Sequence, residues 1–121
     1  MNKEQYQMLR ALETEGVTYQ DAQALRRISM TLHRWHEMEC GSYGACIERD
    51  EETGIPYFWT AGGTRYRTPD REKGALKRLG IIMARYPHLT HYIQGDPRGC
   101  ALYILPAGVS EDAYHNGIAV Y

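Results

Sequence analysis

The stretch from Leu25 to Gly41 constrains the fold of this chain more than any other part of it. Its large apolar residues recur at i, i+3, i+7 and i+10, which places them along one side of a helix: Leu25, Ile28, Leu32 and Trp35. Glycine adopts the left-handed conformation that ends many helices, so Gly41 predicts the stop. We expect a helix over 19–40 that forms the centre of the hydrophobic core.

Two further helices are predicted from apolar spacing and from capping residues. Residues 2–15 form a short helix with Tyr6, Leu9 and Leu12 facing inward, and Gly16 ends it. Thr18 is a suitable N-cap for the long helix that follows. This arrangement predicts an N-terminal helical hairpin.

The third helix is predicted to begin at Thr68-Pro69, with threonine as N-cap and proline at the first helical position. Pro87 forces its end. Gly74 and Gly80 lie inside it, where each costs about 1 kcal/mol relative to alanine. We therefore expect close packing against another element at these two glycines.

The remaining segments read as short strands separated by turn residues. Residues 45–49, 56–60 and 64–67 predict an antiparallel meander, followed later by strands at 91–94, 100–105 and 117–121. Residues 106–116 read as a loop. Because residues 101–105 are apolar on both alternating faces, they predict a central strand covered on both sides. The expectation is a single α+β domain spanning residues 1–121. It has the helical hairpin and one further helix packed on an antiparallel sheet of four to six short strands.

The charges are balanced overall but unevenly placed. The 14 lysines and arginines and 15 acidic residues give a net charge of −1, so no global charge directs the chain to nucleic acid or to an anionic membrane. The acidic residues gather between Glu37 and Glu52, and the basic ones between Arg65 and Arg85. This pattern predicts one acidic end and one basic face.

Three cysteines, an odd number, argue against a disulfide framework and for a reducing compartment. The first twelve residues have no apolar signal region, and no run approaches the roughly 20 apolar residues that span a bilayer. We therefore expect a cytoplasmic protein with no membrane partner.

Four segments together resemble a family of small proteins encoded by tailed bacteriophages and prophages. The most specific strings are TLHRWHEMECG, ending at Gly41, and YIQGDPRG, beginning at Tyr92; segments 70–87 and 114–121 add to the likeness. Residues 42–66 depart from the longer versions of the family. The resemblance implies a setting, the infected bacterium, and no mechanism. Small accessory phage proteins are often modulators of host machinery, including inhibitors of CRISPR–Cas, and this analogy is associational.

A zinc site is one chemical possibility. His36 and Cys40 are spaced i, i+4 on the long helix, and Cys46 and Cys100 could add ligands. No C-x-x-C pair is present, however, and cysteine is often simply buried. We expect no metal and no cofactor.

Six arginines are the candidate binding residues. Arg71, Arg78 and Arg85 are seven residues apart on the third helix, and the preceding strand could extend this arginine ridge; the full set is Arg65, Arg67, Arg71, Arg78, Arg85 and Arg98. The ridge could follow phosphates or contact an acidic partner surface. The alternative is a solvated helix face with no partner.

Catalytic signatures are missing from the sequence. It has no phosphate-binding loop, no dinucleotide glycine fingerprint and no nucleophile elbow. We therefore expect a non-enzymatic accessory protein, monomeric or homodimeric, that binds and inhibits a host protein or ribonucleoprotein, most plausibly an anti-CRISPR-like defence inhibitor. The alternative is a small nucleic-acid-binding protein. Stacking on bases would require Tyr57, Trp59, Tyr66 or Tyr92 to be exposed on the sheet face.

Overall fold

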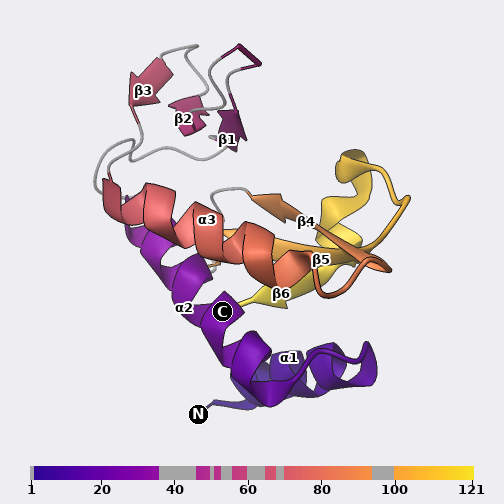
Figure 1. Cartoon of the computed structure of the whole chain (residues 1–121). Coiled ribbons are helices and arrows are strands. Elements are labelled where there is room, and N and C mark those ends of the chain that lie inside the picture. The colour runs from indigo at the N-terminus through magenta and orange to yellow at the C-terminus, as the bar shows by residue number, and fades with distance from the viewer. Residues whose placement is uncertain are drawn as a thin grey trace.

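A computed structural model of the chain describes residues 2–35, 46–49, 51–52, 56–59, 65–67, 70–93 and 100–121. The helices are α1 (Lys3–Thr14), α2 (Tyr19–Trp35), α3 (Asp70–Met83) and the short 3-10 helix η2 (Glu111–Asn116). The strands are β1 (Cys46–Arg49), β2 (Pro56–Trp59), β3 (Arg65–Arg67), β4 (Leu89–Ile93), β5 (Leu102–Pro106) and β6 (Ile118–Val120). The chain is therefore α+β, as its sequence predicts (Figure 1).

The expected single sheet of four to six strands is not confirmed. Within the described residues the strands pair as two antiparallel sheets of three, in the orders β1-β2-β3 and β4-β5-β6. The first is a meander in which each strand pairs with the next along the chain. Helix α3 begins soon after β3, and the chain that returns from it starts a new sheet at β4. Short-range hairpin pairing therefore completes the first sheet before the second begins.

The core lies between the three α-helices and one face of the β4-β5-β6 sheet. Helix α2 contributes the side chains that its periodicity predicts, and Leu25, Ile28 and Leu32 are each almost completely buried. Helix α2 packs against α1 and α3, and both α1 and α2 contact β6. Trp35 is the last residue of α2, and the predicted continuation through residue 40 to Gly41 lies outside the described residues.

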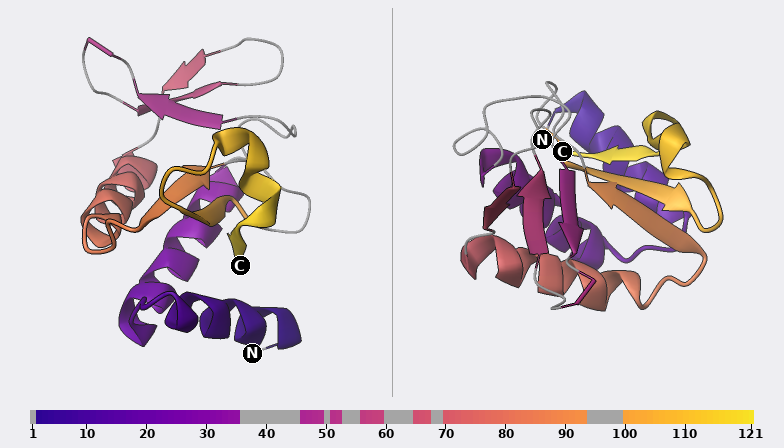
Figure 2. Two further views of the ribbon diagram at one scale, coloured as in Figure 1. Left: turned by 90° about the vertical axis from the view of Figure 1, so that its right-hand side faces the viewer. Right: turned by 90° about the horizontal axis from the view of Figure 1, so that it is seen from above.

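Strand β5 is central and covered on both faces, as predicted. Residues 101–105 are all buried. Leu102 and Ile104 face the helices in the core, whereas Tyr103 packs edge-on against Tyr114 of η2, with ring centroids 5.0 Å apart. The left view of Figure 2 shows α3 and η2 on opposite sides of strands β4 and β5. The segment 106–116, expected as a loop, thus includes a helical turn that covers the outer sheet face.

Capping residues define the hairpin between α1 and α2. Gly16 adopts a positive φ of 87°, and the Thr18 hydroxyl accepts a hydrogen bond from the Asp21 backbone N–H at 3.1 Å, as an N-cap does. Tyr6, predicted to face inward, is instead 54% exposed. It contacts Arg10 one turn later, because its hydroxyl accepts a hydrogen bond from that guanidinium.

A buried serine ties α2 to the sheet. The Ser29 hydroxyl donates to the Val120 carbonyl at 2.6 Å and accepts from the Ala101 N–H at 3.1 Å. Ala101 directly precedes β5, and Val120 is the last residue of β6, where its register partner is Leu102. One small side chain thus satisfies two buried backbone groups and sets the position of α2 against β5 and β6.

The close packing expected at the two helical glycines is wrong. A Cβ built on Gly80 meets nothing within 4 Å, and one on Gly74 meets only the end of the Arg78 side chain at 3.9 Å. Neither glycine is required by a neighbouring backbone. No helix in the described residues is long and apolar enough to cross a membrane.

Candidate anion-binding groove

A groove of about 680 Å³ runs between α2 and α3 on the surface of the helical layer. Four of its lining residues come from α2 and three from α3: Ala24, Arg27, Ile28, Thr31, Arg71, Gly74 and Arg78. The α2 residues recur at i, i+3, i+4 and i+7, and the α3 residues at i, i+3 and i+7. Each set therefore forms one stripe along its helix, and the groove lies between the two stripes.

The groove is hollow because small residues occupy its floor. Ala24 and Gly74 face it from opposite helices, and Ile28 supplies a buried apolar surface at its base. The Arg78 guanidinium extends over Gly74, since a methyl group built there would lie 3.9 Å from its Nη1 atom. Gly74 thus provides space for an arginine side chain instead of contact with another element.

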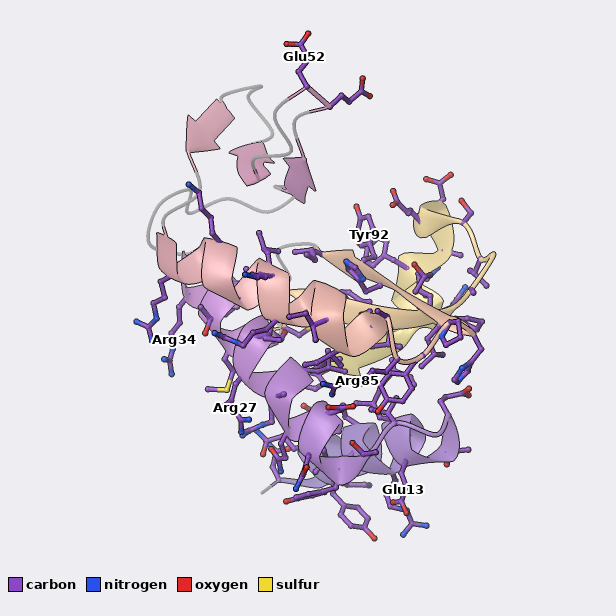
Figure 3. All side chains as sticks on the ribbon, in the orientation of Figure 1. Glu13, Arg27, Arg34, Glu52, Arg85 and Tyr92 are labelled. Carbon is purple, nitrogen blue, oxygen red and sulfur yellow. The ribbon has the colours of Figure 1, made fainter. Side chains whose placement is uncertain are left out.

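Three arginines line this apolar floor. Arg27, Arg71 and Arg78 are all exposed, and among the described residues no carboxylate forms an ion pair with any of them. Figure 3 shows Arg27 and Arg34 extending from the same side of α2. Guanidinium groups stay protonated at all physiological pH values and present fixed pairs of N–H donors. The groove therefore offers positive charge and planar donors suited to carboxylates or phosphates.

The two helices that border the groove carry more basic than acidic residues, which adds to its positive charge. Seven basic residues lie on α2 and α3 against three acidic ones: Arg26, Arg27, Arg34, Arg71, Lys73, Lys77 and Arg78 against Asp21, Asp70 and Glu72. One of these acids, Asp21, is already paired with an arginine outside the two helices. A chain with a net charge of −1 thus carries a basic helical layer.

Arg85 lies apart from the groove. Its Nη1 donates to Asp21 Oδ1 at 2.7 Å, and the Arg85 side chain is 56% exposed against 12% for Asp21. In Figure 3 it lies between the end of α3 and the start of α2. The helix has ended at Met83, so the seven-residue spacing that aligns Arg71 with Arg78 no longer applies at Arg85.

The Asp21 carboxylate joins the two helices through a second hydrogen bond. The Tyr86 hydroxyl donates to Asp21 Oδ2 at 2.5 Å and accepts from the Thr18 N–H at 3.2 Å. Burial alone raises the pKa of Asp21, but the hydrogen bonds from Tyr86, Arg85 and Thr18, with the charge of Arg85, outweigh it. The pKa of Asp21 is therefore lowered from its ordinary value of 3.8. This network is structural and occupies Arg85.

The three other predicted binding residues belong to different parts of the chain. Arg65 and Arg67 belong to β3, and Arg98 lies outside the described residues. Sequence reasoning missed Arg27. The available signal was its place between Ala24 and Thr31, in a stripe of small residues beside the apolar face of α2.

Two of the four zinc candidates lie outside the described residues. His36 and Cys40 lie outside the described residues, Cys46 begins β1, and Cys100 is buried before β5. Within the part of the chain that the structure describes, no three histidine, cysteine or acidic residues cluster as metal ligands would.

Of the aromatic residues considered for base stacking, Tyr92 contacts other rings. Tyr92 stacks on Tyr114 with ring centroids 4.8 Å apart and an interplanar angle of 24°. Tyr114 also contacts Tyr103, so the three rings cover the outer face of the β4-β5-β6 sheet. Tyr57, Trp59 and Tyr66 lie on β2 and β3, in the other sheet. Comparison with protein-family models, curated proteins and solved structures found no match to this chain.

Proposed function

We propose that this chain is a phage accessory protein that binds a host macromolecule through the groove between α2 and α3 and inhibits it without turnover. The observation that carries the proposal is the convergence of Arg27, Arg71 and Arg78 from two helices on one apolar-floored groove. Such an arrangement has no stabilising role of its own, because like charges gathered on one surface repel each other. Binding of an anionic partner would remove that repulsion.

The biological part of the proposal rests on the phage-like segments of the sequence. A protein or ribonucleoprotein of a bacterial defence system, such as a CRISPR effector, is the class of target that we favour. Its acidic surface or phosphate-binding site would meet the basic helical layer. The proposed place of action is the cytoplasm of the infected host, with the chain as a monomer or a homodimer.

The residues that line the groove are suited to binding and poorly suited to catalysis. Arginine does not exchange protons near neutral pH, and the Thr31 hydroxyl donates to the Arg27 carbonyl at 3.0 Å. Among the described residues that line the groove there is no histidine, cysteine or carboxylate. These features support a role in recognition.

Affinity capture tests the proposal directly. The tagged wild-type chain is incubated with bacterial lysate beside two double variants, Arg71→Glu/Arg78→Glu and Lys3→Glu/Arg10→Glu. Both variants change the net charge equally, but only the first reverses groove residues. We expect a host target to be retained by the wild type and by the control variant and to be absent from the groove variant. In phage plating assays on strains that carry a defence system, the wild type and the control variant should protect the phage from that system. The groove variant should not.

Capture that is equal for all three proteins, or protection that survives reversal of both groove arginines, would contradict the proposal. The second candidate function is nucleic-acid binding, which the same three guanidiniums could support through phosphates. A gel shift that weakens steeply as salt rises, with no protein captured, would favour it.

A further inference from the structure

The groove combines two surface properties that a small anion would not require together. Its floor is apolar, formed by Ala24, Ile28 and Gly74, and its walls carry three guanidiniums. A phosphate or a lone carboxylate needs only the charges. An amphipathic partner uses both, because its apolar side chains leave water while its acidic ones meet the arginines.

An exposed isoleucine lies on α3 in line with the stripe of residues that borders the groove. Ile81 lies seven residues after Gly74 on α3, so it extends the same stripe by two turns, and 52% of it is exposed. On α2, Arg34 is placed seven residues after Arg27 in the same way. Since Asp21 at the start of α2 contacts Arg85 just beyond α3, the two helices run in opposite directions. Ile81 and Arg34 therefore extend the two stripes at opposite ends.

The spacing of the arginines matches the repeat of a helix. Arg71 and Arg78 are separated by two turns of α3, a rise of about 10.5 Å. Carboxylates at i and i+7 on a partner helix lying along α3 have the same separation. An acidic residue at i+3 or i+4 would then fall between them, on the side where Arg27 projects from α2.

A nucleic acid fits these features less well. Its phosphates would be held over an apolar floor, and none of the described residues that line the groove has an aromatic ring to stack on a base. The tyrosine rings that could do so cover the outer face of the sheet instead. The net charge of −1 also supplies no long-range attraction for a polyanion.

We propose that the groove between α2 and α3 binds an acidic amphipathic helix of a partner protein. Carboxylates of that helix at i and i+7 pair with Arg71 and Arg78, a carboxylate between them pairs with Arg27, and apolar side chains pack on Ala24 and Ile81. This inference rests on the proposed function and specifies the chemistry of the partner at the same site.

The test uses two fluorescent peptides of about 18 residues, long enough to form helix in part. The patterned peptide carries glutamates at i, i+3 and i+7 with leucines at i+4 and i+8. Its isomer has the same composition with the glutamates distributed around the helix. Fluorescence anisotropy is measured with the full-length chain at low salt. We expect the patterned peptide to bind at least about tenfold more tightly than the isomer.

Variants assign the roles of individual groove residues. Arg71→Glu/Arg78→Glu should weaken binding of the patterned peptide by about 100-fold, because each charge-assisted hydrogen bond to an arginine contributes about tenfold to the affinity. The control Lys3→Glu/Arg10→Glu should change it by less than about twofold, which excludes an effect of net charge. A peptide with lysines in place of the glutamates should bind the groove variant better than the wild type. Ile81→Ser should weaken the patterned peptide while leaving the folded state intact, because Ile81 is exposed.

Equal binding of the two isomers would overturn the inference, since the helical pattern of carboxylates would then play no part. Preferential binding of a DNA oligonucleotide that competes with the peptide and depends on Arg71 and Arg78 would also overturn it, in favour of a phosphate ligand. Neither result changes the interpretation of the lysate experiment, which tests the proposed function. A host target captured through the groove arginines, together with no preference for the patterned peptide, leaves the proposed function standing and rejects only the helical partner.

Discussion

A single buried carboxylate, Asp21, determines how the start of α2 meets the end of α3. It is the acceptor for Arg85 and Tyr86, which lie 64 and 65 residues later in the chain. From its sequence context, Asp21 is only an acidic residue in the first turn of a helix. Acidic residues are common there because they interact favourably with the helix dipole, not because they bind distant side chains. The partners could not be read from that context, because they are brought together only by folding.

Replacing Asp21 with asparagine is expected to lower the free energy of unfolding by about 1–3 kcal/mol at neutral pH, because the Tyr86 hydroxyl loses a charged acceptor inside the protein. Urea denaturation measures the change. Since the folded pKa of Asp21 is lowered below 3.8, its contribution is fully present above the unfolded pKa and is lost as the pH falls through the folded pKa. The difference between wild type and variant should therefore shrink on acidification from about pH 5 to about pH 2.

Glu13→Gln is the matched control, since it removes an exposed carboxylate from α1. It should shift stability by less than about 0.5 kcal/mol. An Asp21→Asn variant as stable as this control at neutral pH would show that the network contributes nothing to the folded state.

Among the elements, α2 and β5 were the most predictable and the pairing of strands the least. The apolar repeat of α2 and the continuous apolar run of β5 both identify buried elements from local pattern alone. Which strands share a sheet depends on hydrogen bonds between distant segments, as in the pairing of Leu102 with Val120. The helical turn of η2 was missed because its burial contact, Tyr114 on Tyr103, has no local periodicity.

Two glycine substitutions of the same kind should have opposite effects on stability. Gly80→Ala adds a methyl group to exposed space on α3, so we expect a gain of about 0.5–1 kcal/mol from helix propensity. Gly117→Ala places a Cβ against Leu105 Cδ2 and 2.7 Å from the Ile104 carbonyl oxygen, an overlap that requires movement of β5 or β6. A loss of about 1–3 kcal/mol is expected there. Thermal and chemical unfolding of both variants, measured side by side, tests the packing at Gly80 and Gly117. If Gly117→Ala left the free energy of unfolding unchanged, the packing described at Gly117 would be refuted.

On the scale of the whole molecule, charge is separated between the helical layer and the rest. Three of the basic side chains of α2 and α3 line a groove, whereas η2 on the opposite side of the sheet begins with Glu111 and Asp112. The sequence predicts a basic face from the residues between 65 and 85 alone. It does not show that Arg27, 38 positions before Arg65, completes that face.

Removing one groove arginine should stabilise the free protein slightly. Arg78→Gln relieves repulsion among Arg27, Arg71 and Arg78, so the free energy of unfolding should rise by up to about 0.5 kcal/mol at low salt. The difference should disappear near 1 M salt, where the screening length is about 3 Å. Denaturation at both salt concentrations measures it. Lys3→Gln on α1 is the control, and a loss of stability for Arg78→Gln at low salt would mean that Arg78 has a structural partner.

The sequence by itself determined the elements whose signals are local: the amphipathic α2, the capping by Thr18 and Gly16, and the doubly buried β5. These follow from periodicity and backbone preference, which act over a few residues. Only the tertiary structure decided that the strands divide into two sheets, that Arg85 is used by Asp21, and that Arg27 joins Arg71 and Arg78. Those outcomes depend on which segments, far apart in the sequence, pack together and exclude water. That packing cannot be predicted from a local sequence pattern.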